Sequence, residues 1–399
     1  MANPTQTDAP FDADARRAVA SVATQFFING AVFASFIPRL PEIRDRIGVS
    51  TDVLGALLTT GAVVGLLGSF IASRVIERFG TRRVLIAGAM VLIATLPVIG
   101  FATAPVIFVL GLGLMAAFDV VVDVAMNLQG SWLSARRHAP IMNRLHGLWS
   151  LGTVVGGLAA AQITSVGISL QSHLLGVALL LGCALVFVGR GLLRVDEDQV
   201  DPVDSDLDEP RASPRTAQPS GRRGLIMLAL AGGFAIAVEL VSSDWAAFRL
   251  SDDFATNAGF AGLGYVAFTV GMTIGRFGGD WALAKIGANA LNRAAVAVTA
   301  IGLAGAALLP NRYLVLVSYV FAGLGISTFF PRLYDKAAQL PGKRGAGLGA
   351  LTAGSRVTAL ATPVIVGSLA ATSLSVGTAT AIVVIPSVLA FAAVTLAVD

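Results

Sequence analysis

The chain has 399 residues, of which 55% are hydrophobic and only 13% are charged, and its mean hydropathy is +0.77. Soluble domains carry about 25% charged residues, so the composition excludes an ordinary soluble protein and indicates a membrane protein. The net charge of +4 comes without the basic stripe that binds nucleic acid, and the single cysteine, Cys183, excludes a disulfide framework.

The N-terminal tail, residues 1–18, is polar and acidic and lacks the basic segment that opens a cleaved signal peptide. We therefore expect the first hydrophobic helix to stay in the membrane as an anchor. The chain then alternates short turns with apolar runs, each of roughly the 20 residues that a helix needs to cross a bilayer. The sequence thus predicts an all-α membrane protein with twelve transmembrane helices. The predicted spans are residues 19–40, 53–73, 83–103, 106–132, 143–166, 170–192, 223–248, 259–282, 289–309, 312–338, 345–370 and 374–397.

Lysine and arginine are distributed unequally between the two ends of these spans. If the N-terminus is cytoplasmic, 21 of the 28 basic residues fall on the cytoplasmic side and only five on the outer side, with Arg276 and Arg356 inside spans. Cytoplasmic loops of membrane proteins carry such an excess of basic residues. We therefore expect a multi-pass membrane protein with both termini in the cytoplasm.

A polar gap at residues 195–222 separates the sixth and seventh spans. It carries eight acids and four prolines and contains no apolar run. This composition is typical of a flexible, disordered linker. It divides the chain into two six-helix bundles, residues 19–194 and 223–399, which we expect it to tether on the cytoplasmic side.

The two halves resemble each other at a constant offset of 207 residues. The segment 54–80 aligns with 261–287, so that Gly68 falls on Gly275 and Gly80 on Gly287. Such a parallel repeat of two six-helix halves is typical of major facilitator transporters.

The loop "SRVIERFGTRR" (73–83) resembles the loop motif of that superfamily, Gly-x-Leu-Ala-Asp-Arg-x-Gly-Arg-Arg/Lys. The match is imperfect, because Ser73 replaces the leading glycine and Thr81 the first arginine after the second glycine. The resemblance implies charge contacts between helix ends that stabilise the outward-open state, and Gly80 permits the tight turn. The gating residues implied in this loop are Glu77, Arg78, Gly80, Arg82 and Arg83.

Three further segments, 123–130, 144–152 and 239–250, are similar to an uncharacterised branch of bacterial permeases related to fucose permeases. The resemblance implies a monomeric, twelve-helix permease of the bacterial inner membrane. Its partners would be the lipid bilayer and a small-molecule substrate, which the resemblance does not name.

The fourth span contains acids and amides in "FDVVVDVAMNLQG" (118–130). Asp119, Asp123 and Asn127 are four residues apart and share one helix face. A charge at the centre of a membrane helix costs about 2.5–3.5 kcal/mol, so we expect this face to line a cavity or contact a partner. Two carboxylates one turn apart resist simultaneous ionisation, so we expect Asp119 or Asp123 to carry a coupled proton. Asn127 and Gln129, nearer the cytoplasm, are expected to be gate contacts; the alternative is that an acid merely fixes the helix.

Polar and aromatic residues in other spans complete a predicted cavity shared by spans 1, 4, 5, 7 and 11. Arg356 can pair with Glu239 or bind an anionic solute group through its planar guanidinium, and a purely structural ion pair is the alternative. Tryptophan rings can stack on sugars, although the membrane interface suits Trp245 as well. The predicted substrate-binding residues are Asn29, Asp119, Trp149, Glu239, Asp244, Trp245 and Arg356.

Arg276 and Asp280 lie four residues apart at the cytoplasmic end of the eighth span. This spacing predicts a pair on one helix face. Because the pair lies near the second-half copy of the loop motif, we expect it to serve gating or structure and not substrate binding.

The sequence lacks other chemistry. It has no phosphate-binding glycine loop for ATP, no cluster of metal ligands and no catalytic motif, so we expect neither an enzyme nor a cofactor. The favoured hypothesis is a proton-coupled symporter of a small polar solute, a sugar or a related metabolite. An exporter of drugs or metabolites coupled to proton antiport is the first alternative, although the fifth span lacks the proline typical of antiporters. A non-transporting sensor on the same fold is the second alternative.

Overall fold

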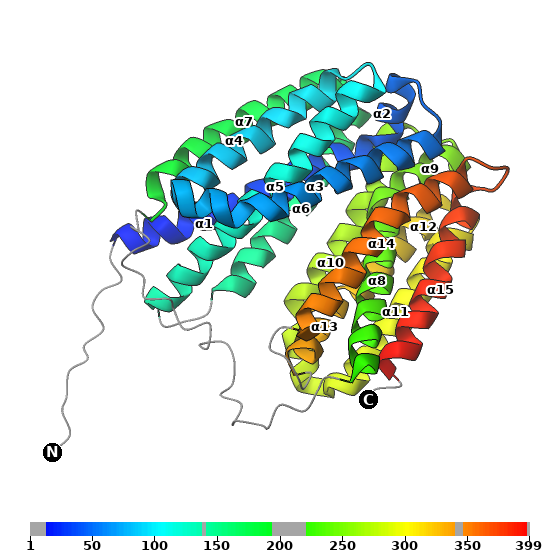
Figure 1. Cartoon of the computed structure of the whole chain (residues 1–399). Coiled ribbons are helices and arrows are strands. Elements are labelled where there is room, and N and C mark those ends of the chain that lie inside the picture. Colours follow the sequence, from blue (N-terminus) through cyan, green and yellow to red (C-terminus); the bar gives the residue numbers. More distant parts are fainter. Residues whose placement is uncertain (1–12, 138–140, 194–220, 340–345, 397–399) are drawn as a thin grey trace.

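The computed structural model describes residues 13–137, 141–193, 221–339 and 346–396, and every regular element within these ranges is a helix. Figure 1 shows two helical bundles, one from each half of the chain. This arrangement confirms the predicted all-α membrane fold. The first bundle contains α1 (Ala13–Phe36), the 3-10 turn η1 (Ile37–Arg39), α2 (Leu40–Ile47), α3 (Thr51–Phe79), α4 (Thr81–Phe101), α5 (Pro105–Arg137), α6 (Met142–Ser165) and α7 (Leu170–Gly191). The second contains α8 (Arg222–Asp244), α9 (Ala246–Phe254), α10 (Ala258–Ile286), α11 (Ala288–Leu308), α12 (Arg312–Ile326), α13 (Phe329–Gln339), α14 (Ala346–Ala370) and α15 (Val376–Leu396).

Eleven of the twelve predicted spans correspond to described helices that are long and apolar enough to cross a membrane. The twelfth is α6, which is also long enough, at about 36 Å. Its glycines and its polar residues lower its hydropathy. Those glycines let α1 pack closely, because a side chain at Gly152 would meet the backbone of Phe27 and one at Gly30 the backbone of Trp149.

The helix bounds differ from the predicted spans at several ends, for example where α3 ends at Phe79, and three differences bear on the architecture. First, α1 begins at Ala13, ahead of the predicted start at residue 19, and α8 begins at Arg222, while most of the predicted linker lies outside the described residues. Second, spans 1 and 7 continue into the short helices α2 and α9. Third, the predicted span 312–338 divides into α12 and α13. At this break the Ser327 hydroxyl donates to the carbonyl of Leu324 at 2.7 Å, and such local bonds compete with the helical ladder.

The internal repeat is present in three dimensions. Helices α3 and α10 begin and end 207 residues apart, as do α4 and α11. Gly80 and Gly287 both adopt a φ of +78°, which favours glycine because it has no Cβ. A side chain at Gly68 would meet the backbone of Ala117, and one at Gly275 would meet Leu324 at the position 207 residues on. The two halves therefore share a packing scheme as well as a sequence pattern.

The bundles meet at the end that carries α2 and α9 and diverge toward the end where α1 begins and α15 ends (Figure 1). Following the expected topology, we name the end with α2 and α9 the outer end. There Arg44 of α2 donates to Asp252 of α9 at 2.5 Å, which links the two halves. The hydroxyl of Thr59 in α3 donates to the carbonyl of Leu360 in α14 at 2.9 Å. The outer end is therefore closed in this conformation.

A buried arginine ties α2 to the first bundle. Arg39, just before α2, is 2% exposed and forms an ion pair with Glu42 at 2.7 Å. Its guanidinium also contacts His173 Nδ1 of α7 and donates to the carbonyl of Ile168, each at 3.2 Å. The outer helix therefore moves with the first bundle.

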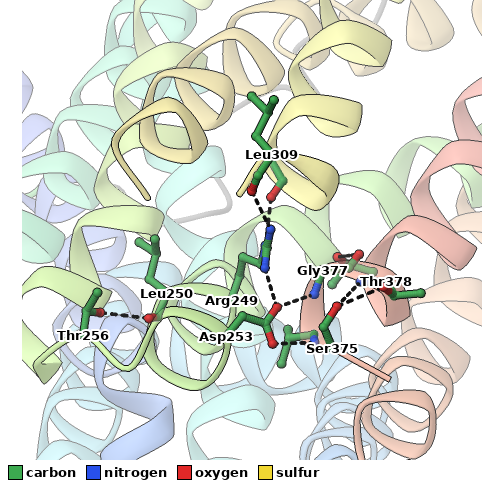
Figure 2. Close-up of polar contacts among 11 residues, drawn as sticks. Arg249, Leu250, Asp253, Thr256, Leu309, Ser375, Gly377 and Thr378 are labelled. Atoms are coloured by element: carbon green, nitrogen blue, oxygen red, sulfur yellow. Dashed lines mark hydrogen bonds and ion pairs between the residues drawn. The ribbon is translucent and has the colours of Figure 1, made fainter. Parts of the chain in front are cut away.

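A second buried arginine does the same for α9 in the second bundle (Figure 2). Arg249 pairs with Asp253 at 2.6 Å and donates to the carbonyls of Ala306 and Leu309. The Asp253 carboxylate in turn accepts the backbone N–H of Gly377 at the start of α15, at 2.8 Å. One ion pair thus holds α9, the α11–α12 turn and α15 together.

Candidate substrate and proton site

Asp119 of α5 and Asn29 of α1 lie side by side in the first bundle. Asn29 Nδ2 donates to Asp119 Oδ1 at 3.1 Å. Asn29 is 4% exposed, and its Oδ1 is buried with no hydrogen-bond partner among the described residues. Asp119 is half-buried, and the described residues give its Oδ2 no partner either. Two adjacent acceptor oxygens are thus left for an O–H donor, which is a solute hydroxyl or a proton on Asp119 itself.

Asp123 is exposed and is satisfied within its own helix. Asn127 Nδ2 donates to the Asp123 carbonyl at 2.8 Å and to its Oδ1 at 3.0 Å. Gln129 points into the protein, is 1% exposed and has a buried Oε1 without a partner among the described residues. The polar face of α5 therefore has two parts. Asp119 forms a hydrogen bond to another helix, and Asp123 forms hydrogen bonds within α5.

Arg276 of α10 reaches across to the first bundle. Its Nη1 donates to Ser150 Oγ at 2.9 Å, and its guanidinium carbon lies 5.6 Å from the centre of the Trp149 ring. It also interacts electrostatically with Glu239 of α8. The described contacts of Arg276 thus join the two halves, while the side chain of its predicted partner Asp280 lies outside what the structure describes.

The acids of the seventh predicted span are half-buried and close to each other. Asp244 accepts a hydrogen bond from Ser243 Oγ at 2.8 Å and interacts electrostatically with Glu239 and with Tyr265 of α10. Tyr334 of α13 interacts electrostatically with Glu239 and also with Asp123 of the first bundle. The two acids of α8 therefore lie within electrostatic reach of residues from α10 and α13.

Two predicted substrate residues form no described contact with these acids. Trp245 is 1% exposed and packs against Phe248 with ring centres 5.1 Å apart, so its ring is enclosed by the protein. Arg356 is exposed, and it forms neither an ion pair with Glu239 nor any hydrogen bond among the described residues. It shares a helix face with Leu360 and Pro363, which meet α3 nearer the outer end.

The loop motif forms the expected turn with few charge contacts. Gly80 has the positive φ that the motif implies. Glu77, Arg78 and Arg83 are exposed, and Glu77 forms no ion pair among the described residues. Arg82 Nη2 instead donates to a backbone carbonyl of α7 at 2.5 Å.

Sequence reasoning missed Gln25, Ser150 and Tyr334. Gln25 lies one turn before Asn29 and is fully buried, with both amide atoms unpaired among the described residues. Its spacing of four from Asn29 was the available signal. Ser150 and Tyr334 have no such signal, because only tertiary packing brings them to Arg276 and Glu239. Within the described ranges, no group of three His, Cys, Asp or Glu residues is placed to hold a metal ion.

Closure of the outer end requires a glycine at position 55. A Cβ on Gly55 would meet the backbone carbonyl of Pro363 in α14. We expect Gly55→Val to cost about 1–3 kcal/mol in the closed form through overpacking and so to favour opening at the outer end. The measurement is labelling of Thr59→Cys by an impermeant maleimide, in a Cys183→Ser background.

We expect labelling to be roughly tenfold faster than without Gly55→Val, because 1.4 kcal/mol is a factor of about ten in population. The matched control is Gly176→Val, since nothing lies within 4 Å of a Cβ at that position. Equal labelling of the two variants would contradict the assignment of this contact to closure.

The comparisons with known proteins agree with this architecture. The sequence matches the family model of the Major Facilitator Superfamily over residues 22–331. An uncharacterised MFS-type transporter of Yersinia pestis is 26% identical over 321 residues, which cover 79% of each chain. The membrane protein MosC of Rhizobium meliloti is 26% identical over 324 residues, which cover 81% of this chain and 76% of MosC.

Solved structures show the same fold. The crystal structure of the nucleoside transporter NupG is similar with a TM-score of 0.71 at 12% identity, covering 95% of this chain and 98% of NupG. A mutant of NupG reaches a TM-score of 0.75 at 11% identity, covering 95% and 99%. Because the family model spans most of the chain, the protein belongs to the Major Facilitator Superfamily and is a transporter, not an enzyme.

Proposed function

We propose that this transporter moves a small polar solute, a sugar or a related metabolite, by alternating access in symport with protons. One observation carries the proposal: Asn29 of α1 donates to the carboxylate of Asp119 in α5 at 3.1 Å and keeps a buried Oδ1 without a partner among the described residues. Ionisable residues inside membrane spans are costly and mark substrate and proton pathways. The region between the bundles is therefore the proposed transport path.

Asp119 is the proposed proton carrier, and Asn29 is its partner. The Asn29 amide donates to one carboxylate oxygen and leaves its own Oδ1 as an acceptor nearby. Asn29 Oδ1 can accept a hydrogen bond from a solute hydroxyl. In the protonated state Asp119 gains an O–H that can donate to a solute oxygen, so a bound solute stabilises the proton, as symport requires. Proton and solute binding are thus linked at one pair of side chains.

The second bundle would supply the counterpart of this pair. Arg276 donates to Ser150 and lies over the ring of Trp149, while Glu239 attracts it from α8. An arginine held between a carboxylate and an aromatic face is placed to respond to a change of charge at Glu239. We propose that this contact couples binding at the site to the packing of α6 against α10.

We further propose that the protein is a monomer in the bacterial inner membrane with cytoplasmic termini. The unequal distribution of lysine and arginine supports this orientation. It makes the present closed outer end an inward-facing state. The exposed Glu77, without an ion pair in the described region, supports the same state, since the motif contacts are expected in the outward-open form.

The test is uptake into proteoliposomes across a panel of sugars, sugar acids and nucleosides, with and without an inward proton gradient. A one-unit pH gradient stores about 1.4 kcal/mol per proton, so a one-to-one symporter of a neutral solute should accumulate it about tenfold. Equal uptake with and without the proton gradient would refute coupling to protons. Accumulation of drugs inside inverted vesicles, in exchange for protons that leave the vesicles, would support the exporter instead.

A further inference from the structure

A groove lies between α4 and α7 in the first bundle, away from the acids between the bundles. Its volume is about 280 Å³. Met90 and Val186 on its walls are 59% and 54% exposed, so the groove opens on the side of the bundle that faces lipid. The residues that line it are Ile86, Met90, Ile93, Gly182, Leu185, Val186 and Gly189.

The groove is entirely apolar along its length and occupies one leaflet. The stretch from Gly182 to Gly189 covers about 10 Å of helix rise, enough for roughly eight methylenes of an acyl chain. Gly182 leaves open space, since nothing lies within 4 Å of a Cβ built there. The orientation proposed above places this stretch in the cytoplasmic leaflet, which is the leaflet of anionic lipids that attract basic residues.

Arginines border the cytoplasmic end of the groove. Arg82 Nη2 donates to the carbonyl of Gly189, a lining residue, at 2.5 Å. The Nε of Arg82 is buried and has no hydrogen-bond partner among the described residues. Arg83 and Arg190 are exposed next to it in sequence and on the neighbouring helix end. Two exposed cations thus stand where a lipid headgroup would lie.

The repeat offers an internal comparison. At the offset of 207 shared by α4 and α11, Arg82 and Arg83 correspond to Asn289 and Ala290. Helix α15 begins 206 residues after α7, so Gly182 corresponds to Val388. The glycine that leaves open space and the two basic residues therefore occur together in the first half and are both replaced at the matching positions of the second.

We propose that this groove binds one anionic phospholipid, with an acyl chain between α4 and α7 and the headgroup phosphate at Arg82 and Arg190. The apolar lining accounts for the acyl chain, and the half-exposed Arg82 with the exposed Arg83 and Arg190 accounts for the phosphate. The acyl chain of a zwitterionic lipid would fit the apolar groove equally well, but its headgroup would be attracted less strongly by the arginines. The site lies outside the transport path, so it binds lipid independently of the solute.

Native mass spectrometry of the purified full chain tests the site, with phosphatidylglycerol and phosphatidylethanolamine of identical acyl chains as the probes. Wild-type protein should bind the first phosphatidylglycerol more tightly than phosphatidylethanolamine. Gly182→Phe fills the groove and should weaken the first binding step for both lipids by about tenfold or more, because each buried methylene contributes. Arg190→Gln should lower the preference for phosphatidylglycerol by about fivefold, the contribution of one basic residue near the surface.

The matched control is Gly176→Phe on the same helix, which also has open space at its Cβ and lies outside the lining. It should bind both lipids like wild type. Equal binding by wild type and by a folded, monodisperse Gly182→Phe would overturn the proposal, as would equal affinity of wild type for the two lipids. If millimolar inorganic phosphate displaced phosphatidylglycerol while Gly182→Phe had no effect, the arginines would be binding a free anion. That result would also overturn the proposal. Solute uptake is not needed for any of these readouts, so they fail or succeed separately from the proposed function.

Discussion

Replacing Asp119 by asparagine will abolish proton-driven accumulation of the solute and leave solute exchange across the membrane intact. The reason is that the new amide keeps a hydrogen-bonding group beside Asn29 but cannot take up or release a proton. With a one-unit inward pH gradient, the steady-state ratio of solute inside to outside should fall from about tenfold to about one. Exchange of labelled for unlabelled solute should continue, because it does not require the proton to leave.

The controls separate coupling from folding and from charge loss in general. Asp119→Glu keeps a titratable group and should restore part of the accumulation. Asp45→Asn removes an exposed carboxylate that pairs with the neighbouring Arg44 within α2, and should leave coupling unchanged. Asp123→Asn tests the second acid, whose bonds lie within its own helix. Full accumulation by both Asp119→Asn and Asp123→Asn would exclude α5 as the site of coupling.

Replacing Arg249 by alanine will destabilise the second bundle more than any other single change at the outer end. Arg249 and Asp253 are 7% and 11% exposed, so the change leaves a carboxylate buried beside two carbonyls that lose their donor. Breaking a buried ion pair in this way costs about 3–5 kcal/mol. The measurement is the free energy of unfolding from titration with sodium dodecyl sulfate in mixed micelles.

A double variant shows whether the cost arises from the uncompensated charge. Arg249→Met combined with Asp253→Asn removes both charges, and the introduced amide still offers an oxygen to the N–H groups at the start of α15. It should be markedly more stable than Arg249→Ala. The control Arg312→Ala removes an exposed arginine at the same end and should change stability little. If Arg249→Ala lowered the free energy of unfolding by less than about 1 kcal/mol, the contacts of Arg249 would not be what holds these helices together.

The sequence predicted the features that depend on local chemistry and on the repeat. The apolar runs predicted the spans, because each span must be long enough to cross the bilayer. Gly80 and Gly287 predicted the offset between the halves, because each permits the turn between two helices. The acids at positions 119 and 123 were found because charge in an apolar run is costly wherever it lies.

The sequence did not predict contacts that only the packing of distant helices creates. Arg276 contacts Ser150 and Trp149, which lie more than 120 residues away and which no pattern in the sequence indicates as its partners. Trp245 was weighed as an interfacial residue, because nothing in the sequence indicates that α9 covers it. The cluster at Arg249 was missed for the same reason, since its carbonyl partners at Ala306 and Leu309 carry no side-chain signal.

The low hydropathy of α6 has a consequence for biosynthesis. The translocon releases a segment into the bilayer according to the segment's own partition free energy, and α6 is the one predicted span that falls short among the described helices. Its glycines at 152 and 156 let α1 pack against its backbone, so α1 supplies contacts that lipid cannot. We therefore expect efficient membrane insertion of α6 to depend on contact with α1. Chains truncated before α6 would leave α1 without that partner.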